Sequence, residues 1–169
     1  ACMCASGRFF ELYDFWCNID AGEILGFSKK LVSSVNTDKI DVIEALKNIG
    51  NIISNKGIST YGLKNKLREF HLEKYLYKSK KDFGLVTVRF NDFKPRDMLK
   101  KDIDKRYLNE YILASCYLPV FKLEKMIDNN YYLDGGFHDY IPANMLINLG
   151  YDKVYVIDLE AIGLRRPYK

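Results

Sequence analysis

The sequence lacks a long hydrophobic run. No stretch of about 18 or more uncharged apolar residues occurs, so no helix of this chain is expected to span a bilayer. The opening residues ACMCASGRFF also lack the basic-then-apolar order of a secretory signal peptide. We therefore expect a protein of the cytoplasm or of the membrane periphery. The length of 169 residues and the apolar content of 48% suit a single domain with one core.

Cysteine is scarce and unevenly placed. Cys2, Cys4 and Cys17 lie in the first tenth of the chain, and Cys116 follows far downstream. This spacing is a poor disulfide framework, which favours reduced thiols. Cys2 and Cys4 form a C-x-C pair, but no second pair or nearby histidine completes the ligand set of zinc. We expect no metal and no other cofactor, and we interpret these cysteines as small buried side chains.

Charge of one sign is not in large excess. The 26 basic and 22 acidic residues leave a net charge of +4, which does not indicate a nucleic-acid partner. Basic residues are nevertheless dense at 78–82 and at 93–106, where the second stretch also carries three aspartates. A solvated loop and helix face is the favoured interpretation of these stretches. Peripheral contact with the headgroups of an anionic membrane is the alternative.

Apolar residues recur with a helical period along much of the chain. The spacing predicts helices over residues 8–16, 38–56, 60–70, 72–78, 104–116 and 142–149. In the last of these, Pro142 suits the first turn and Gly150 suits the end. Its apolar side chains Met145, Leu146 and Leu149 are expected to face inward.

Four other segments have the composition or length of strands. FGLVTVRF (83–90) is rich in β-branched and aromatic residues and predicts a central strand, which Pro95 is expected to stop. VFKLEKM (120–126) and YYLD (131–134) predict two short strands. KVYVIDL (153–159) is almost continuously apolar, as are strands covered on both faces. Helices alternating with such strands predict an α/β fold with a parallel sheet and flanking helices.

An aspartate followed by two glycines stands where the strand at 131–134 gives way to a helix. Asp134 would then lie at the carboxyl end of a strand, where open α/β sheets place their active crevice. Without a Cβ, Gly135 and Gly136 can take positive φ and pass close to a neighbouring loop, which would hold the carboxylate at a fixed edge. A turn with a helix-capping aspartate is the alternative interpretation.

The residues around this motif resemble a known family. An A-S-x-x-x-P segment precedes a strand, then Y-x-D-G-G, then a proline and a helix that leads to a further strand. In this chain these elements are Ala114, Ser115 and Pro119, then Tyr132 with Asp134, Gly135 and Gly136, and then Pro142. Their order is similar to that of the middle and carboxyl-terminal part of patatin-like phospholipases. LYDFWCNIDAGEILGF and KKDFGLVTVRF also resemble middle segments of the family, so the resemblance covers almost the whole chain, most weakly at 29–56.

The resemblance implies a fold and a chemistry. The fold is α/β, a three-layer α/β/α patatin-like sheet with flanking helices. The reaction is hydrolysis of a phospholipid or other acyl-lipid ester by a serine and aspartate dyad without a catalytic histidine. Asp134 would be the general base that takes the proton of the serine hydroxyl, with Gly135 and Gly136 as its support. His71 and His138 are accordingly interpreted as polar residues and not as catalysts.

Two other motifs of the family do not occur in the sequence. The chain has no G-x-S-x-G nucleophile elbow and no G-G-x-R-G stretch for the oxyanion hole. We expect both upstream of Ala1, with ACMCAS as the continuing nucleophile helix, so that residues 1–169 form a single partial patatin-like domain. Ser115, with Pro119 nearby, is interpreted as packing near the active face and not as a replacement nucleophile.

Two hypotheses for the function follow. In the first, the chain is part of a patatin-like lipid acyl hydrolase, lacks activity in isolation and tends to self-associate through exposed strand edges. In the second, the chain is a complete, non-catalytic module that binds lipid or another protein.

Overall fold

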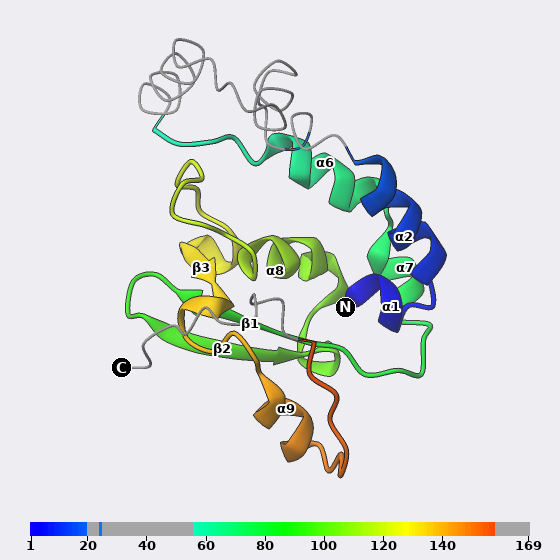
Figure 1. The fold of residues 1–169 in the computed structure, drawn as a ribbon. Helices are drawn as coiled ribbons and strands as arrows, with labels where there is room; N and C mark the ends of the chain where they lie inside the picture. The colour runs from blue at the N-terminus through cyan, green and yellow to red at the C-terminus, as the bar shows by residue number, and fades with distance from the viewer. Residues whose placement is uncertain (20–23, 25–55, 158–169) are drawn as a thin grey trace, which may run out of the picture.

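The structure is a computed structural model that describes residues 1–19, 24 and 56–157 (Figure 1). It is a mixed α/β protein, as expected. The α-helices are α1 (Cys2–Ala5), α2 (Phe9–Asn18), α6 (Tyr61–Glu69), α7 (Leu72–Leu76), α8 (Leu108–Ala114) and α9 (Ala143–Asn148). The strands are β1 (Gly84–Arg89), β2 (Lys94–Leu99) and β3 (Tyr132–Asp134), and short 3₁₀ turns are η1 (Lys100–Asp102), η2 (Lys105–Tyr107), η3 (Ile127–Asn129) and η4 (Gly135–Phe137).

Most of the helices follow the predicted periodicity. Helices α2, α6, α7, α8 and α9 lie within or close to the predicted ranges. Helix α6 begins after Thr60, and the Ser59 hydroxyl accepts the backbone N–H of Tyr61 at 3.2 Å. Gly150 has a φ of +88°, as expected for a residue that ends a helix. Of the helix predicted at 38–56, residues 38–55 lie outside the described residues.

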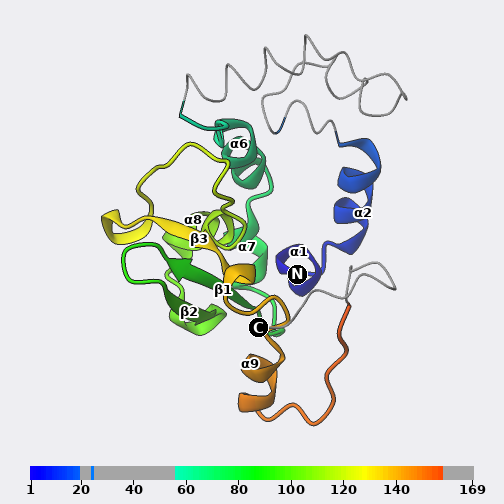
Figure 2. The ribbon, with the colours of Figure 1, turned by 60° about the vertical axis from the view of Figure 1, so that its left-hand side comes forward.

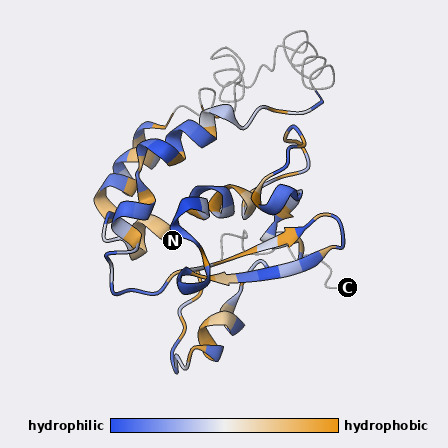
Figure 3. Ribbon diagram, turned by 180° about the vertical axis from the view of Figure 1, so that it is seen from behind, coloured by the Kyte–Doolittle hydropathy of each residue, from blue (hydrophilic) through white to orange (hydrophobic). Residues whose placement is uncertain are grey.

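The described strands form one antiparallel sheet in the order β2-β1-β3. β1 is central, as predicted, and four of its six residues are buried. Figure 3 shows the contrast between the largely hydrophobic β1 and the largely hydrophilic β2. The expected parallel sheet is wrong for these strands, since both partners of β1 run antiparallel to it.

The strand β2 was not predicted. Its residue Pro95 was expected to stop β1, but it pairs with Val88 inside the hairpin that β1 and β2 form around the turn 90–93. A proline can join an edge strand because its nitrogen can face solvent, where no ladder hydrogen bond is needed. The basic stretch at 93–106 therefore starts as an exposed edge strand and not as a loop that leads into a helix.

The predicted strand at 120–126 is wrong, and the described part of the strand predicted at 153–159 does not form one. In 120–126 only Phe121 makes a β-bridge, with Ile58. In 153–157 the chain has no strand structure, and Tyr155 and Ile157 are 81% and 87% exposed. Both segments are apolar enough for a strand, but neither pairs with a described strand along its length, and apolar composition alone does not form a ladder.

Helices lie on both sides of the sheet. Helix α8 packs on β1 and buries Leu108 and Leu113 in the main core, while α9 lies on the other side (Figures 1 and 2). Met145 of α9 reaches Gly84, where a Cβ would lie 2.3 Å from its sulfur atom. The other apolar residues of this region, Leu146 and Leu149, are exposed, so their expected inward orientation is wrong. The order of layers is helix, sheet, helix.

None of the helices in the described part of the chain has both the length and the apolar content that a bilayer crossing requires.

Glu124 ties the segment after α8 to helix α6. Its carboxylate accepts a hydrogen bond from the Thr60 hydroxyl at 2.7 Å and pairs with the Lys64 ammonium at 2.6 Å. Burial raises the pKa of Glu124, whereas the hydrogen bonds from Lys64 and Thr60 lower it. The hydrogen bonds have the larger combined effect, so the pKa lies below its usual value of 4.5. The charged carboxylate therefore stabilises the folded chain.

Replacing Glu124 with glutamine should remove a pH-dependent part of the stability. The lowered pKa contributes stability that is present above about pH 4.5 and is lost as the pH falls through the folded-state pKa. We expect a loss of about 1 kcal/mol at pH 7 and convergence with the unmodified chain as the pH falls below the folded-state pKa, measured by urea unfolding. Glu69→Gln, which removes an exposed partner of Lys66, is the control and should cost less at pH 7. Equal pH profiles for Glu124→Gln and the unmodified chain would contradict this role.

Candidate active site

The backbone of Asp134 is fixed from two sides. Asp134 is the last residue of β3 and pairs with Thr87 of β1. Its N–H donates to the carbonyl of Tyr117 at 2.9 Å. The fully buried hydroxyl of Thr87 donates to the carbonyl of Leu133 at 3.0 Å, which adds a side-chain bond to the ladder. The strand end that carries the carboxylate is therefore held by β1 and by the segment that follows α8.

The Asp134 carboxylate caps the turn η4. Its Oδ1 accepts the backbone N–H of Gly136 at 2.7 Å, and the N–H groups of His138 and Asp139 both donate to the carbonyl of Gly135 at 2.9 Å. The interpretation of Asp134 as a capping residue is thus confirmed. Capping also orients the side chain, because one carboxylate oxygen is committed to the turn.

The two glycines are needed for close approach. A Cβ on Gly135 would lie 2.3 Å from the carbonyl oxygen of Val86, a backbone atom of β1. A Cβ on Gly136 would lie 3.2 Å from Oδ1 of Asp134 itself. Neither glycine has a positive φ, so the expected left-handed conformation is wrong, and the neighbouring segment is a strand and not a loop. The first glycine brings the turn against β1, and the second leaves room for the carboxylate.

Asp134 borders a cavity of about 650 Å³. The cavity brings together residues from both ends of the described chain. Its lining includes Asp134, Gly135, Gly136, Ser115, Cys116 and Pro142 from the carboxyl-terminal half, and Ala1, Cys2 and Trp16 from the amino-terminal helices. The sequence motifs identified the first group except Cys116. They did not place Trp16, Asp139 or Tyr140 at the site, although these residues also line the cavity. These residues reach it through tertiary packing.

Of the histidines, Pro119 and Ser115, which were also considered from the sequence, only Ser115 lines this cavity. Pro119 is exposed in the turn after α8 and is not among the residues that line the cavity. His138 follows the turn η4 but does not line the cavity either. The side chain of His71 is 69% exposed and lies 4.0 Å from Glu73. Ser115 does line the cavity, at the carboxyl end of α8, where it is not on a strand-to-helix elbow.

The two thiols of the cavity are poor nucleophiles. Burial raises the pKa of Cys2 to about 11. The pKa of Cys116 is also raised to about 11, by burial of the thiol and by the charge of Asp134. Although Cys116 is exposed as a residue, its sulfur turns back to α8 and lies 3.3 Å from the carbonyl oxygen of Ile112. Both thiols are therefore neutral near pH 7, and a thiol is a much weaker nucleophile than a thiolate.

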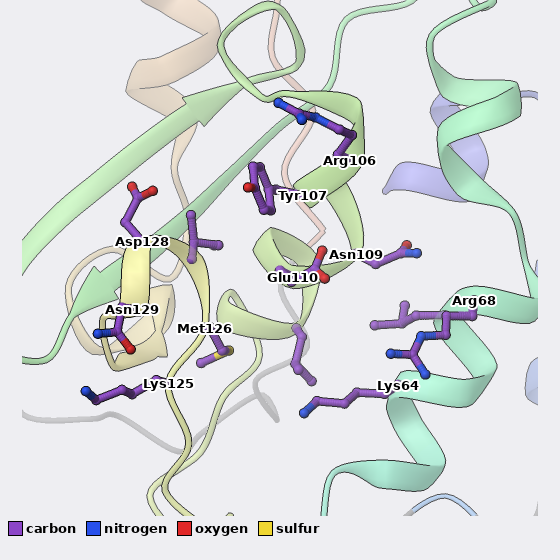
Figure 4. A pocket seen from close by; sticks show the side chains of 13 residues that line it. Lys64, Arg68, Arg106, Tyr107, Asn109, Glu110, Lys125, Met126, Asp128 and Asn129 are labelled. Atoms are coloured by element: carbon purple, nitrogen blue, oxygen red, sulfur yellow. The ribbon is translucent and has the colours of Figure 1, made fainter.

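A second cavity, of about 740 Å³, lies between α6, α8 and the segment 125–129 (Figure 4). Lys64, Arg68, Arg106 and Lys125 line it together with the acidic residues Glu110 and Asp128. Lys64 is paired with Glu124, and Arg106 is paired with Asp104. The positive charge is thus largely offset within the protein, and none of the candidate catalytic residues lies there. Although it is the larger of the two, this cavity is not the candidate active site.

No group of three or more metal-ligating side chains gathers at one point among residues 1–19, 24 and 56–157.

The fold and the site define an α/β protein in which an aspartate, held at the end of a strand, lines a cavity. Comparison with protein families assigns it further: the patatin-like phospholipase family matches residues 1–147, and the chain belongs to that family. Comparison with curated proteins and with solved structures gives no match. The family suggests a lipid acyl hydrolase, whose substrates are lipids.

Proposed function

We propose that this chain forms the aspartate-bearing part of a serine-dependent lipid acyl hydrolase, with Asp134 as its general base. The observation that carries the proposal is the cavity, which Asp134 lines together with Ala1 and Cys2 at the start of helix α1. A nucleophile carried by the segment that leads into α1 would lie close to the same cavity. Membership of the patatin-like family supports an ester of a lipid as the substrate.

The proposed reaction assigns different tasks to the two oxygens of the carboxylate. Oδ1 stays hydrogen-bonded to the N–H of Gly136 and fixes the orientation of the side chain. Oδ2 takes the proton of the serine hydroxyl as the serine oxygen attacks the ester carbonyl, and the proton then passes to the leaving alcohol as the carbon–oxygen bond of the ester breaks. Water hydrolyses the acyl-enzyme with Asp134 again as the base. Hydrogen-bond donors for the oxyanion are also needed.

The chain of 169 residues should be inactive in isolation. A carboxylate without a nucleophile and without oxyanion donors does not catalyse acyl transfer, and the cavity thiols are neutral at pH 7. We expect no release of p-nitrophenol from an acyl ester by the purified chain and no labelling by a fluorophosphonate probe. The full-length protein, assayed beside it, should hydrolyse the ester and react with the probe.

Labelling of a serine in the isolated chain would overturn this expectation. Ser115 is the residue to test in that case, because it lines the cavity with Asp134. Loss of the labelling in Ser115→Ala, with labelling retained in Ser79→Ala, would identify Ser115 as a nucleophile.

A further inference from the structure

Helix α2 has an aromatic face that the described part of the chain leaves uncovered. The helix contains no buried residue. Its outer side chains are 56% exposed at Phe9, 81% at Phe10, 60% at Tyr13 and 64% at Trp16. The opposite side of the helix is attached to the protein, since Leu12 packs against the main core and the ring of Phe15 lies 5.1 Å from that of Phe70. We call the four outer residues the α2 aromatic face.

The start of α2 is fixed to the rest of the domain. Arg8, which precedes the helix, donates to the carbonyl of Phe70, pairs with Glu11 and stacks over the ring of Tyr75 at 4.4 Å. The α2 aromatic face is therefore presented by an anchored helix and not by a loose end. An ordinary protein surface exposes apolar residues singly. Four large exposed aromatic side chains on one side of a short helix form a contiguous patch, which indicates a contact site.

The α2 aromatic face is continuous with the candidate active site. Trp16 belongs to the face and also lines the cavity of Asp134. A ligand that covered the face would therefore adjoin the cavity at Trp16. This continuity favours a lipid aggregate as the ligand of the α2 aromatic face. An ester with a long acyl chain must leave such an aggregate to reach Asp134, and a docking face that adjoins the cavity shortens that path.

The charges of α2 favour a neutral lipid surface. The charged residues of the helix itself are the acids Glu11 and Asp14, and the nearby Arg8 is already paired with Glu11. Tyrosine and tryptophan suit the boundary between lipid and water because each has an apolar body and a polar group. We propose that the α2 aromatic face docks on a zwitterionic lipid–water interface and aligns the cavity with it. The choice of lipid as occupant rests on the proposed function.

Intrinsic fluorescence can test this docking directly, because Trp16 is the only tryptophan of the chain. On addition of phosphatidylcholine vesicles to the 169-residue chain we expect a blue shift of the Trp16 emission and quenching of that emission by brominated phosphatidylcholine. We also expect no loss of binding at 0.5 M salt, an ionic strength that largely screens charges separated by more than about 5 Å. Phe10→Gln combined with Tyr13→Gln keeps the reporter and should weaken vesicle binding about tenfold or more, since interfacial binding scales with the buried apolar area.

The matched control changes two equally exposed aromatic residues elsewhere. Phe93→Gln combined with Tyr155→Gln removes side chains that are 67% and 81% exposed, and this variant should bind as the unmodified chain does. The proposal is overturned if phosphatidylcholine vesicles do not bind, or if both double variants bind equally. It is also overturned if binding requires anionic lipid and disappears in high salt, which would assign it to the basic stretches, or if self-association buries Trp16 before lipid is added.

The docking test is separate from the catalytic assignment. Asp134→Asn should leave vesicle binding unchanged, because the carboxylate is not part of the α2 aromatic face. A chain that binds vesicles while its full-length form hydrolyses no ester would contradict the proposed function alone. A full-length protein that hydrolyses soluble esters but binds no vesicles would contradict the docking alone.

Discussion

Asp134→Asn in the full-length protein should abolish ester hydrolysis while leaving the fold intact. Removal of a general base costs about 10²–10⁴-fold in rate. The amide oxygen of asparagine can still accept the N–H of Gly136, which the carboxylate Oδ1 accepts at 2.7 Å, so the turn η4 keeps its cap. The amide nitrogen that replaces the other oxygen cannot take a proton from serine. We expect kcat to fall by this factor in a p-nitrophenyl ester assay, with an unchanged melting temperature.

Asp139→Asn is the matched control for this variant. Asp139 lines the same cavity, and its Oδ1 accepts the N–H of Ile141 at 3.0 Å, a contact that asparagine can also make. The same chemical change at Asp139 therefore tests whether any loss of cavity charge is enough to lower activity. Turnover retained in Asp134→Asn, or an equal loss in Asp139→Asn, would refute the assignment of Asp134 as the base.

Gly135→Ala should destabilise the domain more than any conservative surface change. The new Cβ would lie 2.3 Å from the carbonyl oxygen of Val86 and 2.6 Å from its carbonyl carbon. These are backbone atoms of the central strand, so they cannot rotate away, and either β1 or the turn η4 must shift. Overpacking of this kind costs about 1–3 kcal/mol. We expect a lower free energy of unfolding in urea for the 169-residue chain.

Gly136→Ala separates stability from activity at the next position. The atoms nearest to its Cβ would belong to the side chains of Asp134, at 3.2 Å, and Tyr140, at 3.8 Å. The Asp134 carboxylate can rotate away slightly, so stability should change little, but the general base is displaced and kcat of the full-length protein should fall. A larger loss of stability in Gly136→Ala than in Gly135→Ala would contradict the packing described for the two glycines.

The sequence predicted those helices and strands whose own residue pattern matches the structure that tertiary packing and strand pairing impose. The apolar period of α6 and α8 and the β-branched content of β1 indicate the elements that the structure contains. β2 was missed because its residues are polar and include Pro95, and only its pairing with β1 makes it a strand. The opposite error occurred at 153–157, where apolar residues predicted a strand that does not form. In both cases long-range pairing decides, and pairing is not a property of one segment.

The candidate site was predictable only in part. Asp134, Gly135 and Gly136 are adjacent in the sequence, and their motif indicates a constrained carboxylate. The role of Gly135 depends on Val86, which is distant in the sequence, so the reason for this glycine was visible only in the structure. From the sequence, Trp16 was predicted only to lie on a helix. A helical period does not predict which side of the helix is exposed or which cavity a side chain lines.

The turn of the β1–β2 hairpin is a suitable site for a tag or a label. The half of β1 that lines the cavity of Asp134 is its beginning, at 84–86, whereas the exposed turn 90–93 follows its far end. Short exposed turns between paired strands tolerate inserted residues when the backbone of the turn makes few hydrogen bonds. A peptide tag or a dye attached to residues inserted in this turn would immobilise or track the molecule from the end of β1 that lies away from the cavity.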